Sequence, residues 1–194
     1  MKDRFADWIA QLAIPVRNKI ERKIVHLDPA ATFLNFNYTP TLEQLYNIAD
    51  HQILHIHGSS KERTEGLVLG HGWSPKEKGS LNQNINLEEA DTRVIEGNRI
   101  VDKYFEATFK PTDQIIIKNR KFFQDLVQVK SIFVMGHSMA EVDLPYFLEI
   151  LRHINARQAT WKVSYHENQA KAEEQFAKLP IDRALVEFAH LEDF

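Results

Sequence analysis

The chain has 194 residues, 43% of them hydrophobic, and a net charge of −3, so it can build a proper core and carries no strong nucleic-acid signal. It contains no cysteine, which excludes disulfides, thiolate nucleophiles and cysteine-bound zinc and suits a reducing cytosol. No apolar run approaches the roughly 18 residues of a transmembrane helix and no export signal opens the chain, so we expect a cytoplasmic protein without membrane contact.

Helical spacing dominates the first thirty residues. Apolar side chains recur every three or four positions, at Phe5, Trp8, Ile9, Leu12 and Val16. This spacing predicts a helical N-terminal segment over residues 1–30, divided at Pro15. A short β-rich run at 32–36 follows and predicts the first strand. Thr39 as N-cap, with Pro40 at the first helical position, then predicts the next helix.

Two more strands are predicted before the middle of the chain. The first covers residues 53–57 and ends at Gly58. Strict alternation along it would place His55 and His57 on the same face. The second is the apolar run 67–69, which enters a glycine-rich turn.

A polar stretch separates these strands from the C-terminal half, and it predicts a loop or lid over residues 73–110. The elements beyond it alternate: a helix after Pro111, a strand at 131–135, a helix after Asp143, a strand at 161–165, a helix near 168–178 and a strand at 184–188. Strands alternating with helices predict one α/β domain over residues 31–194, a three-layer sandwich with a mostly parallel, Rossmann-like sheet.

Unusual polar residues and glycines gather at three predicted strand ends: residues 35–39, 55–58 and 136–138. In an open parallel sheet, ligands bind beyond the carboxyl ends of the strands, so we expect these segments to converge. Glycine lets a backbone approach a ligand closely, and the N-termini of the helices that follow can hold phosphate. The ligand that this pattern favours is a nucleotide.

The same segments carry a family resemblance. The ordered blocks are Phe33–Thr39 with Thr41-Leu42-Glu43, then Ile53–Gly58, Leu67–Gly72, and Val134–Ser138 with Asp143. Together they resemble the AbiH family of bacterial phage abortive-infection proteins, which implies that an infected cell shuts itself down in response to a phage-derived trigger. The glycine-rich nucleotide turn of that family is absent, because the first glycine of this chain is Gly58. The chain therefore resembles the C-terminal part of an AbiH protein.

A fainter resemblance links three of these blocks to sirtuin-like NAD-binding domains. Asn37-Tyr38, His57-Gly58 and Gly136-His137-Ser138 with Asp143 are similar to the strand ends that hold NAD in that fold. The resemblance implies that Asn37 and His57 are a catalytic pair acting on the nicotinamide ribose of NAD, with NAD as substrate or ligand. It also implies a set of nucleotide contacts: Gly58, Gly136, His137, Ser138 and Asp143.

Each of these residues also has a structural interpretation. His57 can cap a strand end, Asn37 can form an Asx-turn, and Asp143 can be an ordinary N-cap. A second possibility is a phosphodiesterase or nuclease that depends on zinc or manganese, with His55, His57 and further side chains as metal ligands. The spacing of these histidines matches no recognised metal motif, so we predict no bound metal. A third possibility is a non-catalytic module that senses a nucleotide or a phage component.

Overall fold

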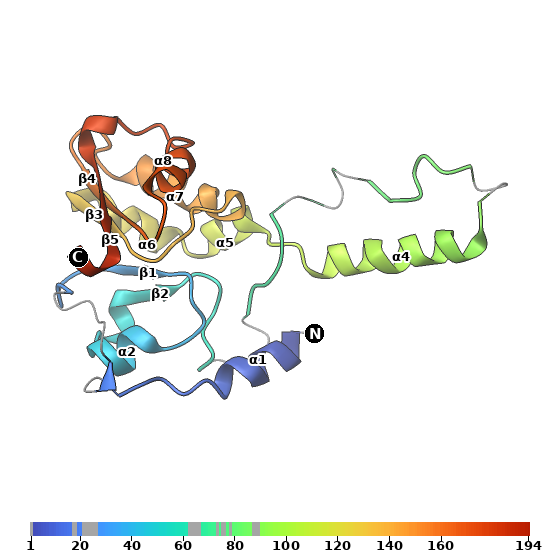
Figure 1. Cartoon of the computed structure of the whole chain (residues 1–194), viewed down its shortest axis with the longest axis horizontal. Coiled ribbons are helices and arrows are strands. Elements are labelled where there is room, and N and C mark those ends of the chain that lie inside the picture. Colours follow the sequence, from blue (N-terminus) through green and yellow to red (C-terminus); the bar gives the residue numbers. More distant parts are fainter. Residues whose placement is uncertain are drawn as a thin grey trace.

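The computed structural model describes residues 2–16, 19–20, 27–61, 67–72, 74, 77, 79–86 and 90–194. Its first elements are α1 (Lys2–Ala10), β1 (Phe33–Asn35), α2 (Thr41–Tyr46), the 3₁₀ turn η2 (Asp50–Gln52) and β2 (Ile53–His55). Later elements are α4 (Thr92–Ala107), α5 (Thr112–Lys118), α6 (Arg120–Gln124), η4 (Asp125–Gln128), β3 (Ser131–Val134), η5 (Glu141–Asp143), α7 (Leu144–His153), β4 (Thr160–Tyr165), α8 (Gln169–Phe176), η6 (Arg183–Leu185), β5 (Val186–His190) and η7 (Leu191–Asp193). Figure 1 shows these elements gathered into one body, from which α4 projects.

All described strands pair in parallel, as the alternation of strands and helices predicted. β1 pairs with β2, and β4 lies between β3 and β5 in a second sheet. The described strands therefore form two small sheets and not the single sheet of the predicted three-layer sandwich. The α/β class is confirmed, because helices and parallel strands alternate along the chain.

One hydrophobic core joins the two sheets. Trp161 and Val163 alternate along β4 on its buried face, and each is 1% exposed. Phe176 of α8 packs edge-on against Trp161 with ring centroids 5.5 Å apart. Leu34 and Phe36, in and just after β1, pack against the same cluster. Because burying each large apolar side chain contributes about 1.5–3 kcal/mol, this shared core holds the two sheets together without a strand ladder between them.

The prediction of a third strand at residues 67–69 is wrong. Residues 67–69 join no described sheet, although the Val68 N–H donates to the His57 carbonyl at 2.8 Å. Leu67 is 2% exposed. The apolar run therefore reflects burial of this segment and not its membership of a ladder.

The N-terminal helix is shorter than its periodicity suggested. α1 ends at Ala10, and the Trp8 side chain on the predicted apolar stripe is 56% exposed. Residues 11–16 are not helical, and residues 17–18 and 21–26 of the predicted segment lie outside the described residues. In the described part of the chain, no helix combines the length and the apolar character needed to cross a membrane.

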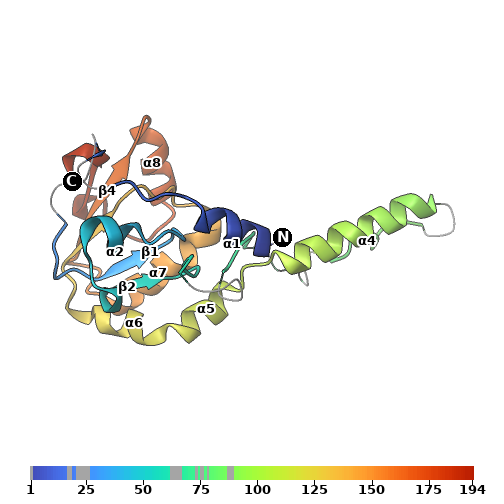
Figure 2. The same ribbon diagram turned by 90° about the horizontal axis from the view of Figure 1, so that it is seen from below.

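The region predicted as a loop or lid contains α4, which extends away from the body in both views (Figures 1 and 2). Two chain segments are tied together at its base: His71 N–H donates to the Thr108 carbonyl at 3.0 Å, and Lys110 N–H donates to the His71 carbonyl at 2.8 Å. Gly70, with φ +119°, allows this approach, since a Cβ there would lie 1.5 Å from the Thr108 oxygen. Lys110 is thereby fixed at the junction of α4 and the body.

Candidate functional site

The ends of the two sheets meet at the ring of Phe36, directly after β1. Its centroid lies 5.5 Å from that of His57, which follows β2, and 4.3 Å from that of His137, which follows β3. The strand ends expected to converge therefore do so, across two sheets. The residues gathered there form the candidate site.

Three ionisable side chains from separate segments surround the Asp143 carboxylate; we call these four residues the Asp143 cluster. His57 Nε2 and Lys110 Nζ lie 3.5 and 3.4 Å from Asp143 Oδ1, and His137 Nε2 lies 3.5 Å from Oδ2. His57, Lys110 and Asp143 are 3%, 8% and 8% exposed. Charged groups this deeply buried are stable only when paired, so the cluster is a single electrostatic unit.

Asp143 does not act as the ordinary N-cap that its position suggests. It precedes α7, but its side chain accepts no capping hydrogen bond. The carboxylate is instead directed to the two histidines and Lys110. Burial alone would raise its pKa, but the hydrogen bond from His137 and the charge of Lys110 lower it below the usual value, so Asp143 is an anion.

The tautomer of His137 follows from its backbone contact. The Met139 N–H donates to His137 Nδ1 at 2.9 Å, so Nδ1 carries the lone pair and Nε2–H faces Asp143. Met139 itself has φ +54°, which is uncommon for a residue with a long side chain. The turn after β3 is thus held in a strained conformation that fixes His137.

His57 is a neutral imidazole at physiological pH. Burial is the main reason that its pKa falls to about 4, and the nearby charge of Lys110 adds to this, which together outweigh the attraction of Asp143. The ring also packs against Tyr146, with centroids 5.6 Å apart. Its Nε2 is buried and makes no hydrogen bond with any residue that the structure describes. A neutral, buried imidazole with an uncommitted nitrogen is suited to accept a proton.

Two tyrosines complete the lining around His57. Burial, followed by the negative charge of Asp143, raises the pKa of Tyr38 to about 12 and also raises that of Tyr146. Both phenols therefore remain protonated. The Tyr38 hydroxyl donates to the Val68 carbonyl at 2.7 Å, whereas the Tyr146 hydroxyl is buried and has no hydrogen-bond partner within the described ranges.

An open hollow lies beyond the carboxyl ends of β3, β4 and β5, with a volume of about 1590 Å³. Gly136, His137 and Ser138 line it, which places three of the five predicted nucleotide contacts together. Gly136 has φ +62°, and a Cβ there would meet no atom within 4 Å. Its N–H donates to Ser164 Oγ at 2.8 Å, so the end of β4 holds the glycine turn in place.

Aromatic and charged side chains also line the hollow. The rings of Tyr165, at the end of β4, and His190, at the end of β5, have centroids 4.3 Å apart. Glu167 and Lys171 contribute charges of opposite sign to the same lining. The two rings are tilted by 50° to each other, so each offers its own face for stacking beside polar groups.

Gly58 and Asp143, the other two predicted nucleotide contacts, do not line this hollow, and neither do Asn37 and His57 of the predicted catalytic pair. Gly58, with φ +87°, closes a turn in which its N–H donates to the His55 carbonyl at 3.0 Å. That turn ends the strand alternation, so the prediction that His55 and His57 share a face is wrong. His57 reaches the Asp143 cluster, whereas His55 contacts Glu43 of α2.

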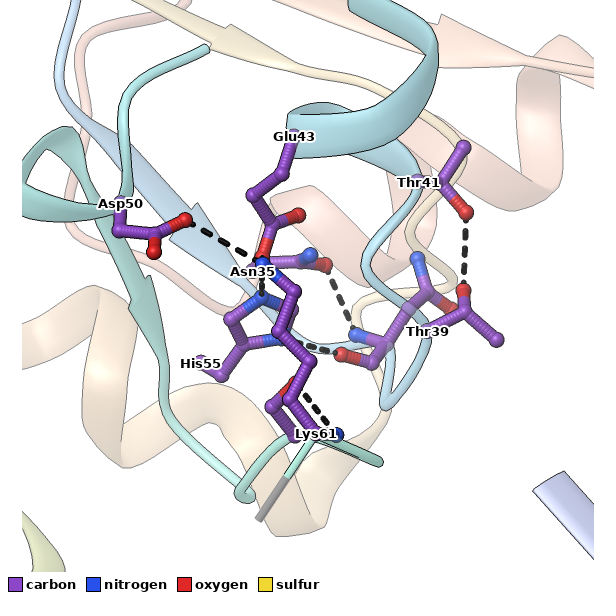
Figure 3. Close-up of polar contacts among 9 residues, drawn as sticks. Asn35, Thr39, Thr41, Glu43, Asp50, His55 and Lys61 are labelled. Carbon is purple, nitrogen blue, oxygen red and sulfur yellow. Dashed lines mark hydrogen bonds and ion pairs between the residues drawn. The ribbon is translucent and has the colours of Figure 1, made fainter. Parts of the chain in front are cut away.

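Figure 3 shows a second polar network, in which Glu43, His55 and Lys61 lie together. His55 Nδ1 lies 2.9 Å from the Asn37 carbonyl, and His55 Nε2 lies 3.1 Å from Glu43 Oε1. Lys61 Nζ also pairs with Glu43 Oε1, at 3.2 Å. The Asx-turn considered for Asn37 belongs to Asn35, whose side chain accepts from the Asn37 N–H at 2.9 Å. Among the described residues, none hydrogen-bonds the exposed Asn37 side chain, so it remains accessible to a ligand.

Sequence reasoning missed Lys110 and Glu43. A lysine is normally exposed, and nothing near Lys110 in the sequence signals that the base of α4 will bury it beside Asp143. Glu43 belongs to a block that carried the family resemblance, but its pairing with His55 depends on how α2 packs over β2. No group of three or more possible metal-ligating side chains is found among the described residues.

Comparison with known proteins gives one match. The family model described as "Bacteriophage abortive infection AbiH" matches residues 1–165. No curated protein and no solved structure matches significantly. Since the match covers most of the 194 residues, the chain belongs to the AbiH family of bacteriophage abortive-infection proteins.

Proposed function

We propose that this AbiH chain acts in the cytoplasm in phage abortive infection by binding a nucleotide, with NAD as the ligand, in the hollow beyond β3, β4 and β5. One observation carries the proposal: a glycine turn lines an open hollow at the carboxyl edge of three parallel strands. Ligands of open parallel sheets bind at this edge. The free space at Gly136 lets a phosphate approach the backbone closely.

The lining of the hollow offers groups for both ends of a dinucleotide. The Tyr165–His190 pair offers a surface on which a base can stack. The glycine turn and His137 lie on the wall shared with the Asp143 cluster. His137 lines the hollow and contacts Asp143, which also contacts His57, so we propose that the reactive end of a ligand lies on the His137 side of the hollow.

Cleavage of NAD is the second function that we propose, and the neutral, buried His57 favours it. In hydrolysis, a water oxygen attacks the anomeric carbon of the nicotinamide ribose, the carbon–nitrogen bond breaks and nicotinamide leaves. His57 would accept the water proton, and Asp143 would stabilise the imidazolium that results. Asn37 would orient the ribose or the water through its accessible side chain.

Binding is tested by calorimetry and thermal shift with NAD and ADP-ribose. Lys171→Glu reverses a charge in the hollow, whereas Lys118→Glu makes the same change at the exposed end of α5, outside it. We expect NAD to raise the melting temperature of the wild type, and Lys171→Glu to weaken binding while Lys118→Glu leaves it unchanged. Absence of NAD and ADP-ribose binding at millimolar ligand, or equal effects of the two variants, would refute the binding site.

Cleavage is tested separately, by release of nicotinamide. His57→Phe keeps the aromatic packing but removes the base, and we expect a loss of about 10²–10⁴-fold in rate. His153→Ala at the far end of α7 is the matched control, since His153 pairs only with Glu149 among the described contacts. His55 is unsuitable as a control because it holds the Asn37 backbone. NAD binding without nicotinamide release would instead support the non-catalytic sensing module.

A further inference from the structure

The base of α4 carries a buried cation that the proposed cleavage of NAD does not use. Lys110 follows Ala107, the last residue of that helix, with two residues between them, and it is buried. A lysine normally reaches solvent, so a buried one needs a specific partner. The helix itself projects from the body in both views (Figures 1 and 2). The position of Lys110 therefore depends on how the projecting helix is attached.

Lys110 and His57 approach the same atom. Lys110 Nζ lies 3.4 Å and His57 Nε2 lies 3.5 Å from Asp143 Oδ1, whereas His137 contacts Oδ2. Lys110 donates to Oδ1, but His57 makes no hydrogen bond to it. A protonated His57 would place a second cation beside the same oxygen, and the two cations would repel each other. Lys110 thus opposes protonation of His57.

The pKa of His57 responds to this charge in a definite direction. Burial is the largest cause of its low pKa, the charge of Lys110 is the next, and Asp143 acts in the opposite sense. The other ionisable groups that face the ring are His137 and the protonated phenols of Tyr38 and Tyr146. Withdrawal of Lys110 from Asp143 would therefore raise the pKa of His57 and make it a stronger base.

Residues 70–72 attach the last turn of α4 and Lys110 to the body. The His71 N–H donates to the Thr108 carbonyl at 3.0 Å, and the Lys110 N–H donates to the His71 carbonyl at 2.8 Å. The His71 ring adds a third bond, in which Nε2 donates to the Phe105 carbonyl at 3.1 Å. We call these three bonds the 70–72 clamp. They hold the backbone of Lys110 and the end of the helix on one short segment.

The same segment packs against the turn that carries Asp143. Gly72 lies so close to Val142 that an added Cβ would stand 2.8 Å from Val142 Cγ2 and 3.1 Å from its Cα. Val142 directly precedes Asp143 in η5. Residues 70–72 therefore contact the backbone of the cation on one side and the neighbour of the anion on the other. A displacement of this segment changes the separation of Lys110 and Asp143.

We propose that the base of α4 regulates His57 through Lys110. With the 70–72 clamp closed, Lys110 occupies Asp143 Oδ1 and His57 is restrained; when α4 moves and the clamp opens, His57 takes that oxygen as its own hydrogen-bond partner. The inference rests on the NAD cleavage proposed above, because it concerns the same base. α4 has no buried residue among those described, so its attachment depends on its base and not on packing along its length.

An NMR titration of the His57 ring, assigned by comparison with His57→Phe, tests the role of Lys110. The wild-type midpoint should lie near the pKa of about 4. Lys110→Gln removes the charge but keeps most of the side chain's length, and it should raise the midpoint by about one pH unit or more. Lys118→Gln, at the exposed end of α5, is the matched control and should leave the midpoint unchanged. Equal midpoints in Lys110→Gln and the wild type would overturn the proposal.

The role of α4 is tested by opening the clamp without altering the Asp143 cluster. Gly70→Ala directs a Cβ into the Thr108 carbonyl, whereas a Cβ at Gly97, within α4, meets no atom within 4 Å. We expect the His57 midpoint to rise in Gly70→Ala and to keep its wild-type value in Gly97→Ala. His71→Leu, which removes the ring bond to Phe105, is the milder variant and should give a smaller rise.

Failure of this inference differs from failure of the proposed function, because the titrations contain no NAD. A chain that neither binds nor cleaves NAD refutes the proposed function. A His57 midpoint that stays at its wild-type value in both Gly70→Ala and His71→Leu refutes the regulation by α4.

Discussion

The buried His57 should make the stability of this protein depend on pH in a way that one substitution removes. Its pKa is about 4 in the folded chain and 6.5 in an unfolded one. Because the unfolded chain takes up the proton first as the pH falls, acid favours unfolding between these two values. The contribution of neutral His57 to the free energy of unfolding is fully present above pH 6.5 and is lost as the pH falls through 4. Over this whole pH range the lowered pKa corresponds to a change of about 3 kcal/mol in the free energy of unfolding. About 2 kcal/mol of this is lost between pH 7 and pH 5.

The perturbation is His57→Phe, which keeps a ring against Phe36 and Tyr146 but cannot titrate. The free energy of unfolding is measured by urea denaturation at pH 7 and pH 5 for both proteins, and the change with pH is compared between them. We expect the wild type to lose about 2 kcal/mol more than the variant over this interval. Equal losses would show that His57 titrates as it does in an unfolded chain, and the argument from burial and Lys110 would then be wrong.

Three further predictions concern the site and the base of α4. Lys110→Met leaves Asp143 buried without its cation and should lower the free energy of unfolding, measured with urea, by about 3–5 kcal/mol. Adding Asp143→Asn should recover part of this loss. Strictly additive losses of the two substitutions would contradict the pairing. Ser164→Ala removes the hydroxyl that holds the Gly136 N–H and should weaken NAD binding, whereas unchanged calorimetry would show that this turn is not part of the binding site. Gly70→Ala should lower the melting temperature, because a Cβ at position 70 would clash with the Thr108 carbonyl. Gly97→Ala is the control and should not lower it, because a Cβ there meets no atom within 4 Å. Equal effects of the two substitutions would refute the close approach of Gly70 to Thr108.

The sequence by itself predicted the α/β class, the parallel strands and which strand ends converge. These follow from local signals: apolar runs of strand length, helical periodicity after Pro111 and Asp143, and glycines directly after strands. The blocks that carried the AbiH resemblance likewise lie along the chain in order, and the family match over residues 1–165 bears that resemblance out. Such features need no knowledge of which elements become neighbours.

Tertiary structure decided the composition of the Asp143 cluster. Lys110 enters it because two distant segments pair at the base of α4, and no pattern within either segment encodes that pairing. His55 and His57 contact different networks because of one turn at Gly58, and strand alternation does not predict that turn. The lowered pKa of His57 is likewise a property of burial and of charges brought from elsewhere in the chain. Local sequence determines what each segment can become, whereas desolvation and charge pairing depend on what surrounds it after folding.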